Sequence, residues 1–439
     1  MARLFGTDGV RGLANGDVLT PELATAVARS AASLVARQPG RRPVAVIGRD
    51  TRPSGTMLAS AAAAGFASAG VDVLLLGVVP TPAVAHACAS GVADLGLVVS
   101  ASHNAMPDNG LKLFGPGGWK LPDDVERAVE DGLREPGVRA TGTDVGAVVE
   151  APAAVVEAYA AALLAAAPGG AAGLRVVVDC AQGAASVLAP EVYRAAGADV
   201  TAIFADADGA HINDGCGATH LARLQEAVVA AGADLGLAHD GDADRCLAVD
   251  AQGRVVDGDQ LLGLLAVALH ERGELDTVVA TVMSNLGFLR AMEAAGIAVV
   301  QTGVGDRYVL EAMRAGGHPL GGEQSGHTVQ LRHATTGDGL LTGLAVLERM
   351  ATTGRALADL AGVVVRLPQV LVNVRADRAR AQADDVLAAV AREEQALGGA
   401  GRVLLRPSGT EPLVRVMVEA DTEELARAVA DRLAAVVGA

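Results

Sequence analysis

The chain has 439 residues, of which 51% are hydrophobic and 2% aromatic, and its formal net charge is −16. One hydrophobic core does not support this length, so several domains are expected. The acidic balance excludes a nucleic-acid binder, which needs a basic face to neutralise phosphates, and local cations must hold any anionic ligand.

The four cysteines stand apart without a CxxC pair, which is typical of reduced thiols in a cytosolic protein. The first ten residues lack the apolar region of a signal peptide, so we expect a cytoplasmic location. The charge-free stretch 73–93 is long enough to raise the question of a membrane span. Because it contains Pro80, Pro82 and His86, a buried strand, a turn and a helix explain it better, and no membrane association is expected.

Along the chain, short apolar runs typical of buried strands alternate with helical runs. The strand-like runs are residues 44–47, 95–99, 175–178, 235–238, 278–282 and 298–302. This alternation predicts parallel sheets covered by helices, in which ligands bind beyond the carboxyl ends of strands. Reacting groups are therefore expected in the loops that follow strands.

Three segments resemble one another, which predicts three units of similar build. They are FASAGVDVLLLG from Phe66, YRAAGADVTAIF from Tyr193 and MEAAGIAVVQTG from Met292. Each ends an alanine-rich helix at a glycine and continues as an apolar strand. Chance similarity in a chain rich in alanine and glycine is the alternative.

The C-terminal part differs from these units and predicts a small α+β domain. Its expected strands are residues 369–375, 402–405 and 414–420, and its expected helices are residues 381–396 and 423–437. Boundaries near residues 150, 255 and 366 give four domains, at 1–150, 151–254, 255–366 and 367–439.

The loop SASHNAMPDNGLK follows the strand-like run 95–99 and contains the candidate nucleophile Ser102. A serine there can also be a simple helix cap. Lys112 favours the nucleophile, because lysine occurs only at Lys112 and Lys120 in a chain that otherwise uses arginine as its cation. A desolvated ammonium can release its proton and a guanidinium cannot, so Lys112 is a candidate proton shuttle. A chance surface lysine is the alternative.

The loop HDGDADR follows the run 235–238 and carries Asp240, Asp242 and Asp244 at alternate positions. Carboxylates this close repel one another unless a cation neutralises them, and oxygen ligands suit Mg²⁺ or Ca²⁺. An EF-hand is excluded, because Arg245 stands where its glycine would be. A solvated acidic turn fits poorly between the apolar runs LGLA and CLAV.

Three further loops offer polar groups. GGEQSGH places Glu323 and Ser325 where they can bind vicinal hydroxyls, although an ordinary turn would look similar. The N-terminal FGTDGVRG holds Arg11 in a glycine-rich turn, and a domain-start hairpin is its alternative reading. RPSGTEPLVR offers donors suited to a phosphate dianion, from Arg406, Ser408, Gly409, Thr410 and Arg415. Neither a P-loop nor a GxGxxG after a strand is present, so nucleotide cofactors are not expected.

Taken in chain order, from FGTDGVRG to RPSGTEP, these five segments resemble the signatures of the α-D-phosphohexomutase superfamily and span essentially the whole chain. INDGCGATH from Ile212, and Gln324 within GGEQSGH, favour the branch that acts on glucosamine phosphates. Two positions depart from the usual pattern: Ala105 replaces a common proline and His211 a common asparagine. Both changes affect loop stiffness or fine specificity and leave the reacting groups in place.

The resemblance implies three similar α/β domains with mixed sheets and a C-terminal α+β domain around a central cleft. It also implies that Ser102 is phosphorylated and that Asp240, Asp242 and Asp244 bind one Mg²⁺ together with an oxygen of that phosphoserine. Lys112, with His103 or His327, manages protons, and Arg11 and Arg245 offset the charge of the moving phosphoryl group. Glu323, Ser325 and His327 contact the sugar, and the RPSGTEP loop binds the distant phosphate.

The expected activity interconverts glucosamine 6-phosphate and glucosamine 1-phosphate through a 1,6-bisphosphate, which supplies UDP-N-acetylglucosamine for cell-wall precursors. The expected partner is a hexosamine phosphate, and relatives suggest a homodimer by analogy. The nearest alternative is a mannose or glucose phosphomutase. A dehalogenase-like phosphatase with Asp240 as nucleophile usually needs a downstream lysine, and none follows Lys120. A non-catalytic sugar-phosphate sensor would be expected to lack Ser102 or Lys112.

Overall fold

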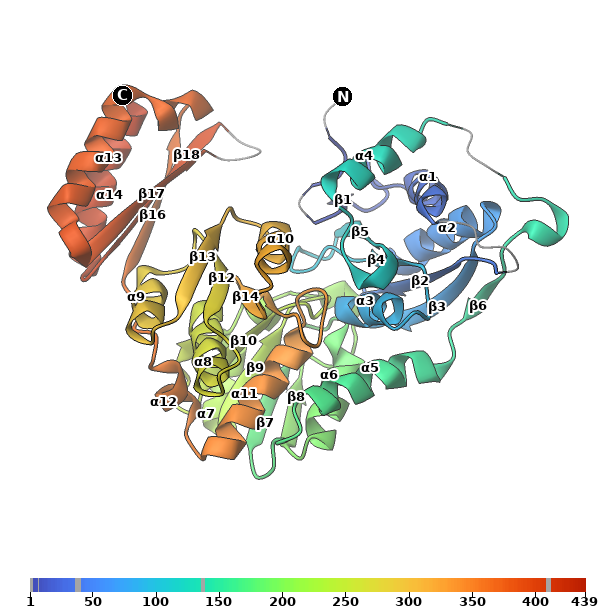
Figure 1. The fold of residues 1–439 in the computed structure, drawn as a ribbon, viewed down its shortest axis with the longest axis horizontal. Helices are drawn as coiled ribbons and strands as arrows, with labels where there is room; N and C mark the ends of the chain where they lie inside the picture. The colour runs from blue at the N-terminus through green and yellow to red at the C-terminus, as the bar shows by residue number, and fades with distance from the viewer. Residues whose placement is uncertain (1–2, 7, 36–40, 136–138, 408–411) are drawn as a thin grey trace. The chain divides into compact units, whose positions relative to one another are not determined.

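The computed structural model describes residues 3–6, 8–35, 41–135, 139–407 and 412–439. It divides into two compact units, one of Met1–Met283 with Ile297–Val363 and the other of Ser284–Gly296 with Val364–Ala439 (Figure 1). Strands in the described part of the chain form four sheets, of six, five, four and three strands. None of the helices in these ranges is both long and apolar enough to cross a bilayer.

The first sheet has the order β1-β5-β4-β2-β3-β6. In it β2, β3, β4 and β6 are parallel, β5 pairs antiparallel with β4, and β1 pairs antiparallel with β5. Its strands are β1 (Val10–Leu13), β2 (Val44–Arg49), β3 (Asp72–Val78), β4 (Leu95–Val99), β5 (Asp108–Phe114) and β6 (Val148–Glu150). Its helices are α1 (Pro21–Ala31), α2 (Gly55–Ser68), α3 (Thr81–Ala89) and α4 (Asp123–Gly132).

Helices cover both faces of this sheet. Side chains of adjacent strand residues point to opposite faces, so one strand can pack against helices on each side. Ile47 and Leu97 lie in the core that β2 and β4 form with α1 and α2. Gly48 and Gly96 face the other way, toward α3, where a Cβ on either would come within 2.7 Å of Val84. The glycines therefore let α3 approach the sheet closely (Figure 1).

The second sheet has the order β11-β10-β9-β7-β8 and the third the order β13-β12-β14-β15. Strands of the second are β7 (Arg175–Asp179), β8 (Asp199–Ile203), β9 (Leu235–His239), β10 (Cys246–Asp250) and β11 (Val255–Val256). Strands of the third are β12 (Thr277–Thr281), β13 (Ala298–Thr302), β14 (Leu320–Gly322) and β15 (Thr328–Gln330). The helices of these segments are α5 (Ala153–Ala166), α6 (Ala185–Ala195), α7 (Ala222–Ala231), α8 (Gly258–Glu271), α10 (Asp306–Gly316), α11 (Gly339–Thr353) and α12 (Leu357–Ala361).

The predicted repeat is confirmed. Its three glycines, Gly70, Gly197 and Gly296, have positive φ angles of 81°, 101° and 75° and lie between a helix and a strand. The strands that follow, β3, β8 and β13, each pair in parallel with the strand before their helix. The three helices are α2, α6 and α9 (Leu286–Ala294).

The three sheets share a second feature that the sequence alternation does not predict. After its parallel strands, each sheet turns back into an antiparallel pair: β4 with β5, β9 with β10, and β14 with β15. The loops that join these pairs are SASHN, DGDADR and GGEQSGH. The three loops that carry the candidate site residues therefore occupy the same place in their sheets. The antiparallel strand that follows each loop makes each sheet mixed.

The C-terminal unit is the predicted α+β domain, with the antiparallel strand order β16-β18-β17. Its strands are β16 (Gln369–Arg375), β17 (Gly401–Pro407) and β18 (Leu413–Ala420), and its helices are α13 (Asp384–Leu397) and α14 (Glu423–Gly438). Val414, Val416 and Val418 alternate into its core. The helix expected from residue 381 begins at Asp384, because Arg378–Gln382 form a separate 3₁₀ turn capped by Asp377.

Candidate functional site

Ser102 meets the aspartate loop directly, although 138 residues separate it from Asp240. Its Oγ donates a 2.6 Å hydrogen bond to Asp240 Oδ2 and lies 3.3 Å from Nδ1 of His103. The residue is 1% exposed and has a φ of 53°, the left-handed conformation that non-glycine residues seldom adopt. The loop therefore aims the Ser102 hydroxyl at the carboxylates of a different sheet.

Asp240, Asp242 and Asp244 form a buried carboxylate triad at the end of β9, with one ligand oxygen from each within 4.8 Å of the others. Thr81, at the start of α3, fixes the turn: its N–H donates to the Asp242 carbonyl at 2.9 Å and its hydroxyl to Asp242 Oδ2 at 2.6 Å. Burial, together with the charges of Asp244 and Asp242, raises the pKa of Asp240 well above its usual value. Such a cluster is stabilised by a cation.

The triad fits a hard divalent cation. Asp242 Oδ1 and Asp244 Oδ1 are buried and have no hydrogen-bond partner among the described residues. Buried charged oxygens without a partner are costly, and a metal ion would satisfy them. Carboxylate oxygens are the ligands that Mg²⁺ and Ca²⁺ prefer. The aspartate pattern seen in the sequence thus has the burial and spacing of a metal site.

Lys112 lies on β5 beside the triad, with its Nζ 2.8 Å from Asp242 Oδ2, 3.3 Å from Asp244 Oδ2 and 2.9 Å from Asp8 Oδ2. Burial alone would lower the pKa of Lys112, as the sequence argument assumed. The carboxylates of Asp242, Asp8 and Asp244 outweigh that effect and raise its pKa well above the usual value. In this arrangement Lys112 is an ammonium ion, so it can act as a proton or hydrogen-bond donor but not as a base, and its raised pKa makes it a weaker acid than a free lysine.

Lys120 is a site residue that the sequence reasoning missed. Its buried Nζ lies 2.6 Å from Asp8 Oδ1 and also pairs with Asp306, at the start of α10. Asp8 thus bridges both lysines, and its pKa lies well below the usual value because their attraction, with that of Arg11, overcomes the effect of burial. The rarity of lysine was a signal for Lys120 as much as for Lys112, but it was applied to Lys112 alone.

A cavity of about 450 Å³ opens beside these groups. Its lining includes Arg11, His103, Asp244, Arg245, Glu323 and His327, so the first three marked loops and the N-terminal turn share one site. Glu323 accepts a hydrogen bond from Gly305 N at 3.1 Å, and Ser325 Oγ is buried without a partner in the described ranges. The guanidinium groups of Arg11 and Arg245, the imidazoles of His103 and His327 and the carboxylate of Glu323 line the cavity, and they suit a phosphorylated, hydroxyl-rich ligand.

The imidazole of His103 lies beside the Ser102 hydroxyl, with Nδ1 at 3.3 Å from Oγ. Burial, with the cations Arg245 and Arg11, lowers the pKa of His103 to about 4. The imidazole is therefore neutral at pH 7 and able to accept a proton. His327 pairs through its backbone with Arg245 and lies 3.5 Å from Asp306, farther from the serine in sequence but lining the same cavity.

In the C-terminal unit, Arg406 and Arg415 occupy directly opposite positions on β17 and β18. Burial and the charge of Arg415 lower the pKa of Arg406. Like charges facing across a strand pair are unfavourable unless an anion lies between them. This pair supports an anion site in the loop RPSGTEP, whose Ser408, Gly409 and Thr410 lie outside the described residues.

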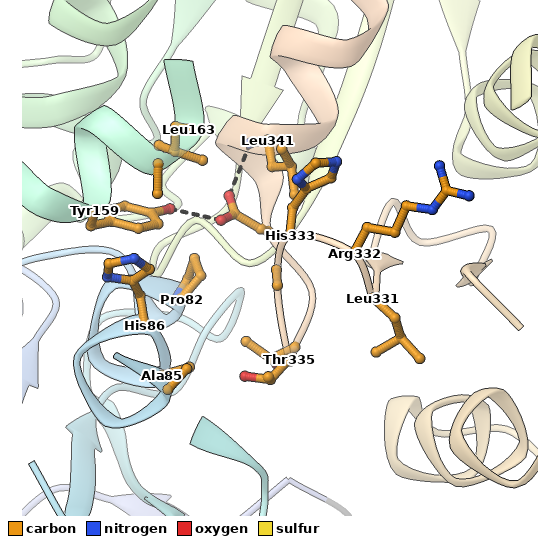
Figure 2. Close-up of a pocket in the computed structure, with 15 residues that line it drawn as sticks. Pro82, Ala85, His86, Tyr159, Leu163, Leu331, Arg332, His333, Thr335 and Leu341 are labelled. Atoms are coloured by element: carbon orange, nitrogen blue, oxygen red, sulfur yellow. Dashed lines mark hydrogen bonds between the residues drawn. The ribbon is translucent and has the colours of Figure 1, made fainter. Parts of the chain in front are cut away.

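A second cavity, of about 210 Å³, lies between α3, α5 and the loop before α11. Figure 2 shows Tyr159, His86 and Leu163 on one side of it and His333 and Thr335 on the other. Tyr159 donates a 2.9 Å hydrogen bond to Asp338, which caps α11 by accepting one from Leu341 N. None of the candidate site residues named above lines this cavity, but its lining includes the titratable carboxyl group of Asp338.

Replacing Asp338 with asparagine should flatten the pH dependence of stability. Burial raises the pKa of Asp338 to about 6. The folded state thus binds this proton more tightly than the unfolded chain, so stability falls as pH rises from about 4 to about 6. Asparagine retains the cap and can donate to the Tyr159 oxygen instead. The free energy of unfolding of the variant, relative to wild type, should rise by up to about 3 kcal/mol across that interval in urea titrations. If the free energies of unfolding of the variant and of wild type changed in parallel with pH, the raised pKa of Asp338 would be contradicted.

The site joins a buried serine hydroxyl, a carboxylate triad fitted to a divalent cation, and cations around one cavity. These are the parts that phosphoryl transfer requires, because that chemistry depends on positioning and charge compensation. The fold and the site thus define an enzyme of the phosphoryl-transfer class.

Comparison with known proteins gives the family. Phosphoglucomutase/phosphomannomutase models match in chain order: α/β/α domain I at residues 2–137, domain II at 157–253, domain III at 257–366 and the C-terminal domain at 371–436. Phosphoglucosamine mutase of Parafrankia sp. is 62% identical over all of this chain and 99% of its own length. The relative from Frankia alni, also a phosphoglucosamine mutase, is 62% identical with the same coverage.

Among solved structures, a phosphoglucomutase/phosphomannomutase family protein of Burkholderia thailandensis superposes with a TM-score of 0.82 and 25% identity, over 99% of this chain and 97% of that one. The chain belongs to the α-D-phosphohexomutase superfamily, and within it to the phosphoglucosamine mutases. It is therefore an isomerase of the mutase type.

Proposed function

We propose that this chain interconverts glucosamine 6-phosphate and glucosamine 1-phosphate, with Ser102 carrying the phosphoryl group between the two positions. The contact that carries the proposal is the 2.6 Å hydrogen bond from Ser102 Oγ to the carboxylate triad. The full-length similarity to phosphoglucosamine mutases supports the choice of sugar.

Asp240, Asp242 and Asp244, with an oxygen of phosphorylated Ser102, would hold one Mg²⁺. The buried Oδ1 atoms of Asp242 and Asp244, which accept no hydrogen bond from any residue that the structure describes, support this assignment. Bound magnesium supplies positive charge that offsets the charge of the transferred phosphoryl group.

The first half-reaction moves the phosphoryl group from Ser102 to the sugar. O1 of glucosamine 6-phosphate forms a bond to phosphorus, the bond from phosphorus to Ser102 Oγ breaks, and the serine oxygen gains the proton that the sugar hydroxyl loses. His103, which is neutral, would accept a proton, and Lys112, which is charged, would donate one. Arg11 and Arg245 face the cavity and would stabilise the spreading negative charge.

The second half-reaction reverses these roles after the 1,6-bisphosphate turns around. Ser102 Oγ bonds to the 6-phosphorus and passes its proton to O6 of the sugar, which leaves as a hydroxyl. Glucosamine 1-phosphate is released and phosphoserine is restored, so the reaction is balanced without another reactant. The sugar would be bound in both orientations by Glu323, Ser325 and His327. The distant phosphate would be bound by Arg406 and Arg415 together with Ser408, Gly409 and Thr410.

We also propose that the four domains meet at residues 150, 254 and 366.

Rates on different sugars test this proposal. We expect kcat/KM on glucosamine 6-phosphate to exceed that on glucose 1-phosphate by about 10-fold or more, because a site that binds an amino group discriminates against a hydroxyl. Both substrates should be assayed with the same preparation and with glucose 1,6-bisphosphate to load Ser102. Equal or faster turnover of glucose or mannose phosphates would assign the chain to the mannose/glucose phosphomutases instead.

A further inference from the structure

A fully buried arginine that the sequence did not mark holds the loop of Ser102. Arg52 follows β2, in the segment GRDTR, and its side chain is 0% exposed. It lies between β2 and α2 and is not among the residues that line the cavity. A buried guanidinium is costly unless each of its N–H groups has a partner, so its contacts show what it is for.

All five N–H groups of the Arg52 guanidinium have a partner. Nη2 donates to the carbonyls of Ser102 at 3.1 Å and Asn104 at 2.7 Å. Nη1 donates to the carbonyls of Ala105 at 2.5 Å and Asp108 at 3.0 Å. Nε donates to Asp50 Oδ2 at 2.9 Å. Four of the five bonds thus end on backbone carbonyls, three in the loop between β4 and β5 and one on Asp108, the first residue of β5.

Asp50 extends this grip to the other side of the Ser102 residue. The same Oδ2 accepts a 2.6 Å hydrogen bond from Ser100 Oγ, and Ser100 Oγ accepts one of 2.9 Å from Ser102 N. Asp50 Oδ1 also accepts a 2.9 Å bond from the backbone N–H of Arg52. The Arg52–Asp50 pair therefore fixes both the N–H and the carbonyl of Ser102.

The grip coincides with a strained backbone. Ser102 has a φ of 53°, which a residue with a Cβ adopts only when its surroundings hold it there. Asn213, which lies between β8 and α7, donates a 2.9 Å hydrogen bond from its side-chain amide to the same Ser102 carbonyl. Gly241 packs so closely on that carbonyl that a Cβ there would lie 2.5 Å from it. Together these contacts decide the direction of the Ser102 side chain.

We propose that Arg52, acting through Asp50 and Ser100, is a positioning residue that aims the Ser102 hydroxyl at the transferred phosphorus. Lysine cannot replace it, because an ammonium has three donors at one point and the loop presents four carbonyls spread around a planar fork. The proposal rests on the function proposed above, in which Ser102 accepts the phosphoryl group.

The experiment compares Arg52→Lys, Ser100→Ala and wild type in their rate of phosphorylation by glucose 1,6-bisphosphate, followed by intact mass. Misplacing a reacting atom by about 1 Å costs about 100-fold in rate, so we expect a loss of that order in Arg52→Lys and of about 10-fold in Ser100→Ala. KM for the bisphosphate should change less than about 3-fold, since the cavity lining is untouched. Arg49→Lys is the matched control, because Arg49 makes a single 3.1 Å bond to the backbone of Asp50, and it should match wild type.

The outcomes separate the two proposals. If wild type gains no phosphate, the proposed function fails, whatever the variants do. If wild type gains phosphate and folded Arg52→Lys gains it at the same rate, or if KM rises while the rate holds, the positioning role is wrong. Should Arg52→Lys not fold, Ser100→Ala decides, because it retains the Arg52–Asp50 pair and every loop carbonyl contact. A wild-type rate in Ser100→Ala would then show that the contacts from Arg52 through Asp50 and Ser100 do not position Ser102.

Discussion

Ser102→Ala should lower kcat by at least about 10⁴-fold, since removing a nucleophile leaves only the catalysis that binding and charge compensation provide. The same variant should gain no phosphate from glucose 1,6-bisphosphate, as judged by intact mass. The substitution removes the side-chain contacts of the hydroxyl with Asp240, at 2.6 Å, and with His103, at 3.3 Å, and leaves the backbone contacts of the loop in place, so a folded protein is expected.

Ser102→Gly is the control that separates chemistry from folding. Glycine adopts the φ of 53° at this position without strain, so its thermal midpoint should be no lower than that of Ser102→Ala. Both variants should be equally inactive. A variant without the hydroxyl that turns over within about 100-fold of wild type, or still gains one phosphate, would place the phosphoryl acceptor elsewhere.

The strands and the two reacting loops could be predicted because their signals are local. Continuous apolar runs identified β4 and β9 at their exact starts, and the three glycines marked the helix–strand repeat. Ser102 and Asp240 each stood after such a run, and the carboxyl ends of strands are where side chains of different units can meet. The structure brings the two within 2.6 Å.

The antiparallel strands β5, β10 and β15 of the first three sheets and the supporting residues could not be located from the local pattern, because their signals are tertiary. β5 contains Asp108, Asn109 and Lys112, and their polarity hides a strand whose burial depends on the neighbouring sheets. Arg52 was invisible for a different reason. In a chain whose cations are almost all arginine, one more arginine carries no information, whereas the two lysines were conspicuous.

Long-range polar contacts also decided where α9 belongs. Asn285, at its N-terminus, exchanges hydrogen bonds with the backbone of Leu367, and Glu419 accepts a 2.9 Å bond from Leu286 N. These partners lie 82 and 133 residues away in the sequence. No periodicity within α9 itself indicates that residues 284–296 cluster with the C-terminal unit, which depends on polar pairs between distant segments.

Asp240→Asn should weaken magnesium binding without lowering the stability of the metal-free protein. Asparagine retains both contacts of the wild-type carboxylate: its oxygen can accept from Arg245 N, and its amide can donate to the Ser102 hydroxyl. It also removes one of three buried like charges, so the metal-free variant should be at least as stable as metal-free wild type. Activity should fall by about 10³-fold, because charge compensation at the transferred phosphoryl group is weakened.

The decisive measurement is the thermal midpoint with and without Mg²⁺. At a concentration about 100 times the Kd, magnesium should stabilise wild type by about 2.7 kcal/mol, and most of that increment should vanish in Asp240→Asn. Asp250→Asn is the matched control, since Asp250 is also buried, on β10, but lies outside the triad and pairs with Arg254. It should lose stability and keep its magnesium increment. If Asp240→Asn kept the increment instead, the triad would not be the metal site, because the ion binds through the negative charge that this substitution removes.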